Sequence, residues 1–266
     1  MAARLMAYIY WDVRPILVHL GPFAVRWYGL FFALLFIIGY WIARWQFRLE
    51  HKDLASLDTL LIYIVLGTII GARLGHCLFY EPDYYLRHPI EILEVWRGGL
   101  ASHGGALGVL TALYLYTRGR PDQPYLWLLD RVAVPTALGG FFIRMGNLFN
   151  SEILGTPSQL PWAFVFARED LVPRHPAQLY EALAYLLVFF GLLWVYNRLR
   201  ERTPRGLLLG LFLVSVFTFR FFIEFVKQHQ ADYQTGLPLK VGQLLSLPFI
   251  AAGIVLLYRA SRPVAK

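Results

Sequence analysis

Long apolar stretches separated by short polar segments recur from one end of the chain to the other. A helix needs about 20 mostly apolar residues to cross the hydrocarbon core of a bilayer, and the pattern predicts seven spans. They cover residues 24–45, 57–79, 98–116, 126–149, 177–196, 206–226 and 241–258. The expected fold class is therefore all-α, a polytopic membrane protein in which residues 1–266 form a single transmembrane domain.

The composition agrees with this interpretation. Hydrophobic residues make up 58% of the chain and charged residues 16%, whereas soluble domains carry about 25% charged residues. The net charge of +8 is explained by arginines in loops beside an anionic lipid surface. We therefore expect the bilayer as a partner and do not expect a nucleic acid. Cys77 is the only cysteine, which excludes an internal disulfide and a thiolate metal cage. The histidines lack metal-ligand spacing, so neither a metal nor a cofactor is expected.

Basic residues are concentrated in alternate loops. They follow the first, third and fifth predicted spans and the last one, at Arg44, Arg48, Lys52, Arg118, Arg120, Arg198, Arg200, Arg202, Arg205, Arg259, Arg262 and Lys266. Loops rich in arginine and lysine face the cytoplasm, so we expect an external N-terminus and a cytoplasmic C-terminus. The loop 150–176 is then external, and its prolines and aromatic residues predict a small cap.

Several polar residues fall inside the predicted spans, mostly toward their external ends. Arg144, Asn147 and Asn150 are three residues apart and share one helix face. Arg144 has no acidic residue three or four positions away, so we expect it to bind an anion such as phosphate. Arg220 and Glu224 are four residues apart, and a structural ion pair between them is an alternative to a functional role. This distribution favours a cavity that opens to the outside.

The stretch "ASHGGALGVL" places His103 beside two glycines. Glycine has no Cβ, so Gly104 and Gly105 would let a ligand approach the backbone closely. The alternative is that His103 is a structural core residue whose hydrogen bonds are made within the protein. A packing role between helices is the better interpretation for three glycines spaced by four, Gly67, Gly71 and Gly75.

Seven blocks in a fixed order resemble one protein family. They are "GPFAVRWYGL", "GARLGHCLFY", "GGLASHGGALGV", "RMGNLFNSEILG", "RHPAQLYEAL", "FRFFIEFV" and "VGQLLSLP", and the chain resembles the phosphatidylglycerol–prolipoprotein diacylglyceryl transferases of bacterial inner membranes. The resemblance implies a multi-pass enzyme of the bacterial inner membrane with a periplasmic N-terminus and cap. It implies transfer of the diacylglyceryl group of phosphatidylglycerol to the lipobox cysteine in a prolipoprotein signal peptide, giving a thioether and glycerol phosphate.

The resemblance also implies which residues act. The catalytic set is His103, Arg144 and Arg220, and the substrate-binding set is Tyr28, Tyr80, Asn147, Glu152, Glu224, Gly104 and Gly105. The chain departs from the family pattern at Ala106, at Ser151 and in the segment "VKQHQADY".

The chemistry of these residue types suits the reaction. Two arginines can hold the phosphate leaving group, and a histidine can take the thiol proton, although the sequence leaves the identity of the base open. A membrane transporter or flippase for an anionic lipid is the alternative function, because it too would need arginines in a membrane cavity. The absence of visible internal repeats argues against it.

Overall fold

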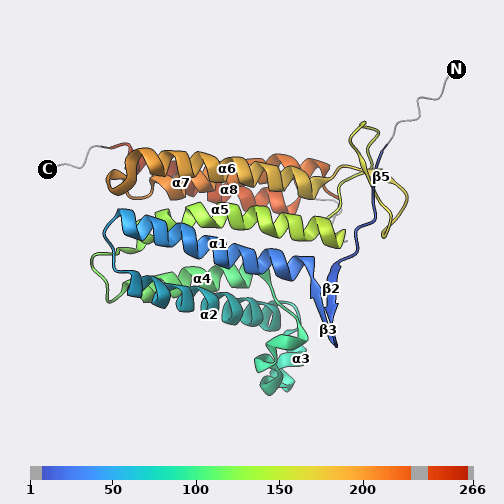
Figure 1. Ribbon diagram of the computed structural model, residues 1–266, viewed down its shortest axis with the longest axis horizontal. Coiled ribbons are helices and arrows are strands. Elements are labelled where there is room, and N and C mark those ends of the chain that lie inside the picture. Colours follow the sequence, from blue (N-terminus) through green and yellow to red (C-terminus); the bar gives the residue numbers. More distant parts are fainter. Residues whose placement is uncertain (1–7, 229–238, 263–266) are drawn as a thin grey trace. The chain divides into compact units, whose positions relative to one another are not determined.

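The computed structural model describes residues 8–228 and 239–262 (Figure 1). Lys266 and the "HQADY" part of the divergent segment lie outside these ranges. The chain divides into two compact units, which are described separately. The first comprises the described parts of Met1–Ile42 and Asp130–Lys266, and the second is Ala43–Leu129.

Helices dominate both units, and within the described residues six are long and apolar enough to cross a membrane. They are α1 (Trp27–Leu49), α2 (Leu54–Phe79), α5 (Tyr125–Asn150), α6 (Ala177–Leu199, continued by the 3-10 turn η3, Arg200–Arg202), α7 (Leu207–Ile223, continued by η4, Glu224–Val226) and α8 (Val241–Ala260). These six match six of the seven predicted spans, so the chain has the helices of a multi-pass membrane protein.

The remaining predicted span, 98–116, is shorter than expected. The helix there, α4 (Ser102–Thr117), has 16 residues, too few to be counted among the six. Gly98 and Gly99 adopt left-handed backbone angles, with φ of 89° and 65°, and a helix cannot pass through them. The sequence pattern did not reveal this break because both glycines are followed by apolar residues.

The expectation of an all-α fold needs a correction, because the described part of the chain contains five short strands. They are β1 (Ile9–Trp11), β2 (Ile16–Leu20), β3 (Phe23–Arg26), β4 (Phe164–Phe166) and β5 (Pro173–Arg174). β2 and β3 form an antiparallel hairpin, so the first helix begins at Trp27 and not at residue 24. β1 pairs in parallel with β4, and β4 pairs antiparallel with β5. The segment 150–176 is thus tied into a sheet.

In the first unit, α1 packs on α5, where a Cβ added to Gly39 of α1 would be 3.6 Å from the Cβ of Pro135 of α5. The helices α6, α7 and α8 lie side by side (Figure 1). Phe31 of α1 stacks on Phe142 of α5 with ring centroids 6.3 Å apart. Asp130 of α5 is fully buried and accepts hydrogen bonds from the backbone N–H groups of Gly206 and Leu209 at 2.6 and 2.9 Å. A carboxylate at a helix N-terminus satisfies unpaired N–H groups and complements the helix dipole, so Asp130 fixes the start of α7.

In the second unit, α2 and α4 approach so closely that side chains are excluded between them. A Cβ added to Gly75 would lie 2.7 Å from the Cα of Gly104, and one added to Gly71 would lie 2.7 Å from the Cα of Gly108. Small residues at such contacts let membrane helices pack backbone to backbone. The packing role expected for the glycines of α2 is therefore confirmed.

The connection between α2 and α4 contains α3 (Pro82–Arg87), η1 (Pro89–Leu93) and η2 (Val95–Arg97). Arg73 of α2 is 3% exposed and donates hydrogen bonds to four carbonyls of this connection. The acceptors are Glu91, Ile92, Gly98 and Gly99, at 2.5, 2.9, 2.7 and 3.4 Å. Arg73 is therefore an internal anchor for this connection.

Candidate active site

Arg144 lies in the last two turns of α5, and its side chain is 11% exposed. Its Nε is 2.9 Å from the Oε2 of Glu181, a residue of α6 whose side chain is 1% exposed. The two groups form an ion pair, but their geometry is not that of a hydrogen bond. Its Nη1 donates to the Oδ1 of Asn147 at 3.1 Å. Arg144 has no acidic residue three or four positions away on its own helix, as the sequence indicated, and its acidic partner comes from a different helix.

Asn147 and Asn150 converge on one carboxylate. The Nδ2 of Asn147 donates to the Oε2 of Glu152 at 3.1 Å, and the Nδ2 of Asn150 donates to Oε1 at 3.0 Å. The chain can turn back here because Ser151 has a left-handed φ of 58°. The side-chain amide of Gln178 also donates to the backbone carbonyl of Glu152. Glu152 is thus held against the end of α5.

Lys227, directly after the turn that ends α7, is 2% exposed and lies between two carboxylates. Its Nζ is 3.1 Å from the Oε2 of Glu224 and 3.7 Å from the Oε1 of Glu181. Burial lowers the pKa of the Lys227 ammonium, and the Glu181 carboxylate opposes this shift. Lys240 donates to the backbone carbonyls of Glu224, at 2.7 Å, and of Lys227. A chain of charges therefore runs from Arg144 through Glu181 and Lys227 to Glu224.

Arg220 does not form the expected alternative pair with Glu224. The Glu224 carboxylate is bonded to Lys227 instead, and it is enclosed by Gly242, where an added Cβ would be 2.7 Å from the carboxylate. Among the described residues, Arg220 makes no ion pair, and it acts electrostatically on Tyr185 and Lys227. Arg220 is thus a cation beside the charged chain, with no carboxylate partner in the part of the chain that the structure describes.

Tyr28 is the second residue of α1 and lies against Gly146 of α5. A Cβ on Gly146 would be 2.6 Å from the ring of Tyr28, so the glycine provides the space for the aromatic side chain. The Tyr28 hydroxyl is within electrostatic reach of Arg144 and Glu152. Six sequence-predicted site residues therefore gather in the first unit, namely Tyr28, Arg144, Asn147, Glu152, Arg220 and Glu224.

The other four predicted residues lie in the second unit. His103 is the second residue of α4 and is exposed. Gly104 abuts the glycines of α2, and an added Cβ on Gly105 would be in ordinary contact with Ala72, 3.5 Å from its Cβ. Tyr80 follows the end of α2, is 66% exposed and stacks on His76. Gly104 therefore has a packing role, as the glycines of α2 do.

The predicted site residues do not include Glu181, Gln178 or Lys227, although all three are part of this network. A signal was present for the first two, because a fully buried carboxylate and amide in an apolar helix need partners. Their spacing of three residues places both on one face of α6. Within the described ranges, no group of three His, Cys, Asp or Glu side chains could hold a metal ion. The network instead offers guanidinium, ammonium and amide donors, which bind anions.

Among the described residues, six helices are able to cross a membrane and the Arg144–Glu181 ion pair is buried between two of them, which defines a multi-pass membrane protein with a polar site among its helices. The family model described as prolipoprotein diacylglyceryl transferase matches residues 15–259, and the chain belongs to this family. It is a transferase of that kind.

Several curated relatives are similar over nearly their whole length. The phosphatidylglycerol–prolipoprotein diacylglyceryl transferase of Chloroherpeton thalassium is 54% identical, covering 96% of this chain and 95% of the relative. The enzyme of the same name from Tolumonas auensis is 50% identical, covering 97% and 100%. The one from Porphyromonas gingivalis is 47% identical, covering 96% of each. The whole chain, and not one segment of it, carries the similarity.

Proposed function

We propose that this protein transfers the diacylglyceryl group of phosphatidylglycerol to the thiol of a lipobox cysteine in a prolipoprotein signal peptide. The sulfur attacks the glycerol carbon that carries the phosphate, and a carbon–sulfur bond forms as the carbon–oxygen bond breaks. The oxygen leaves with its electron pair as glycerol phosphate, and the thiol proton passes to a base. The names of the relatives, which state both substrates, support this assignment.

The observation that carries the proposal is the charge arrangement around Arg220. The other cations of the network are held by protein oxygens, Arg144 by Glu181 and Lys227 by Glu224. Arg220 has no carboxylate among the described residues, although it lies in a helix able to cross a membrane. A cation at that position favours an anionic partner. A phosphate whose negative charge grows as the bond breaks is such a partner.

Each predicted site residue of the first unit then has a role in the reaction. Arg220 supplies charge to the phosphate, and Arg144, fixed by Glu181 and Asn147, presents its remaining guanidinium donors to the same group. Asn147, Glu152 and Tyr28 bind the polar part of the lipid. Glu224 is a binding residue that Lys227 holds in place.

The second unit contributes His103, which we assign as the residue that takes the thiol proton. It is exposed at the first turn of α4, so an incoming peptide can reach the imidazole. Gly104 and Gly105 support this turn against α2, and Tyr80 contributes to substrate binding from the end of α2. No metal or cofactor enters this reaction, since substitution at carbon needs only a nucleophile, a base and a stabilised leaving group.

We further propose that the chain forms one transmembrane domain with seven crossings, in the bacterial inner membrane. β1 precedes α1 and β4 follows α5, yet the two strands pair in one sheet, so an even number of crossings must separate them. α1, α2 and α5 supply three. A fourth crossing by α4, about 24 Å long from its 16 residues, makes the number even.

The test is a reconstituted reaction with purified protein, phosphatidylglycerol vesicles and a lipobox peptide. We expect the peptide to gain one diacylglyceryl group by mass spectrometry while glycerol phosphate appears in equal amount. A peptide with serine in place of the lipobox cysteine is the control and should stay unmodified. If the protein instead moves phosphatidylglycerol between leaflets and no lipidated peptide forms, the transporter alternative replaces the proposal.

A further inference from the structure

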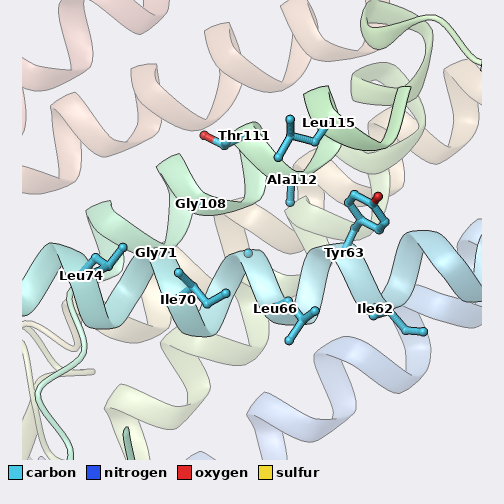
Figure 2. A pocket seen from close by; sticks show the side chains of 11 residues that line it. Ile62, Tyr63, Leu66, Ile70, Gly71, Leu74, Gly108, Thr111, Ala112 and Leu115 are labelled. Carbon is cyan, nitrogen blue, oxygen red and sulfur yellow. The ribbon is translucent and has the colours of Figure 1, made fainter. Parts of the chain in front are cut away.

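A groove runs along the contact between α2 and α4, within the second unit. Figure 2 shows its wall on α2, where Ile62, Leu66, Ile70 and Leu74 follow one another along the helix. These residues are four apart, so they form a row nearly parallel to the helix axis. The other wall is formed by α4, and the cavity measures about 390 Å³. The α4 side consists of Gly108, Thr111, Ala112 and Leu115.

The groove exists because its floor has almost no side chains. Gly67 and Gly71 of α2 face Gly108 of α4, and a Cβ added to Gly67 would be 2.7 Å from the Cβ of Ala112. The close approach of the two backbones leaves a furrow flanked by larger apolar residues. Thr111 is the polar side chain beside Tyr63 in the lining, and its hydroxyl already donates to the carbonyl of Leu107 at 2.9 Å. The surface of the groove is therefore almost entirely apolar.

The surroundings of the groove indicate what fills it. α2 is long and apolar enough to cross the membrane, and Ile62, Leu66 and Ile70 are 58%, 50% and 54% exposed. Side chains this apolar and this exposed on a membrane-spanning helix face hydrocarbon. The twelve residue steps from Ile62 to Leu74 span about 18 Å. One leaflet of hydrocarbon is about 15 Å thick, so the length suits a single extended acyl chain.

The outer end of the groove lies close to the turn that carries His103. Gly71 and Leu74 line this end, and Gly75, one residue further, abuts Gly104. His103 directly precedes Gly104 in the first turn of α4. A lipid whose acyl chain lies in the groove therefore has its glycerol backbone at the level of His103.

We propose that the α2–α4 groove holds an acyl chain of the donor phospholipid and thereby sets the position of its glycerol backbone and the preferred chain length. This inference rests on the proposed function and adds the subsite for the lipid tail. Inside a bilayer the acyl chain gains no hydrophobic free energy by entering the groove, because it is already in hydrocarbon. The groove acts by packing against the acyl chain and by aligning the lipid. We therefore expect it to affect which lipids the protein prefers.

Two neighbouring tryptophan substitutions test the groove. Ile70→Trp places a bulky ring in the lining, whereas Ile69→Trp is its matched control, on an exposed position of α2 outside the lining. Transfer to the lipobox peptide is measured with phosphatidylglycerol of short and of long acyl chains. We expect Ile70→Trp to lower the long-chain to short-chain ratio of kcat/KM about fivefold through lost packing contacts. Ile69→Trp should keep the ratio of the unmodified protein.

A second measurement identifies the occupant. Phosphatidylglycerol with a photoreactive group in one acyl chain should label peptides from residues 62–74 and 108–115, and unlabelled phosphatidylglycerol should compete better than phosphatidylethanolamine. Equal competition by both lipids would mean a general bilayer lipid and overturn the assignment to the donor. Equal chain-length ratios for the two variants would overturn it as well. If the unmodified protein transfers nothing from either lipid, it is the proposed function that fails.

Discussion

Arg144 is held at two of its nitrogens, by Glu181 through Nε and by Asn147 through Nη1. Lysine keeps the positive charge but loses the planar arrangement that makes both contacts at once. We expect Arg144→Lys to reduce transfer about 100-fold, the loss typical of removing one preorganised donor from a developing anion. The measurement is the rate of peptide lipidation at equal amounts of membrane-inserted protein.

The matched control for this substitution is Arg198→Lys. Arg198 is exposed and lies over the ring of Trp194, where lysine can replace it as a cation. Its transfer rate should stay within about twofold of the unmodified protein. Near-normal transfer by Arg144→Lys would show that transfer needs only a positive charge at this position and does not need a fixed guanidinium.

His103 allows a prediction about pH. Glutamine is similar in size and forms hydrogen bonds, but it cannot take up a proton near neutral pH, and loss of a general base costs about 100-fold or more in rate. A cysteine thiol ionises near pH 8.5, so the deficit of His103→Gln should shrink as pH rises through that range. The measurement is the transfer rate from mildly acidic to alkaline pH. A constant deficit would mean that His103 does not act on the thiol proton.

At this scale the sequence predicted the members of the network better than their contacts. Helical spacing correctly placed Arg144 and Asn147 on one face, and they are bonded to each other. Spacing along one helix could not show that Arg144 pairs with Glu181, because this contact joins different helices. It also could not show that Glu224 pairs with Lys227, because this contact depends on the turn after α7. Contacts between helices are determined by packing and have no local signature.

Among the elements, the contact between α2 and α4 tolerates the least change. A leucine at Gly104 would force its side chain into the backbone of α2, where an added Cβ is already 2.7 Å from the Cα of Gly75. Overpacking of this kind costs about 1–3 kcal/mol, and we expect Gly104→Leu to lower thermal stability in detergent and to abolish transfer at every pH. Recovery of its activity at alkaline pH would contradict a packing role.

Gly191→Leu provides the control for that experiment. Gly191 lies in α6, and an added Cβ there meets nothing within 4 Å. Leucine also favours helix over glycine by roughly 0.5–1 kcal/mol, so this variant should be at least as stable as the unmodified protein. Comparing the two unfolding temperatures separates the effect of the α2–α4 contact from that of removing a glycine.

The elements that the sequence missed are those that a hydrophobicity pattern cannot resolve. The strand β3 is largely apolar and runs directly into α1, so it extended the first predicted span by three residues. Gly98 and Gly99 shorten α4 through their positive φ angles, which apolar neighbours conceal. Long apolar runs identified the six longest helices, since length alone distinguishes a membrane span.

For the whole molecule, the testable property is its orientation across the membrane. The arginine bias predicts that residues near Glu169 lie outside and residues near Arg200 lie inside. In a Cys77→Ser background, single cysteines at Glu169 and Arg200 report on the two sides. An impermeant thiol reagent added to cells with a permeable outer membrane and an intact inner membrane should label only the Glu169 position.

Both positions are exposed in the structure, so both should react once the inner membrane is opened, which is the control. Labelling at Arg200 before the inner membrane is opened would reverse the orientation and place the thiol acceptor on the wrong side. The single native cysteine, Cys77, is buried, so its replacement removes background labelling without altering an exposed surface.

The pairing of β1 with β4 has a consequence for how the protein is made. Ile9 pairs with Phe164, so the first strand has no partner until more than 150 residues have been synthesised. At the usual elongation rate of about 5–20 residues per second, this delay amounts to roughly 10–30 s. During that time the helices from α1 to α5 leave the ribosome and enter the bilayer, and β1 has no strand to pair with. Closure of the sheet is therefore a late event of biogenesis, and it fastens the beginning of the chain only after the first helices have been inserted.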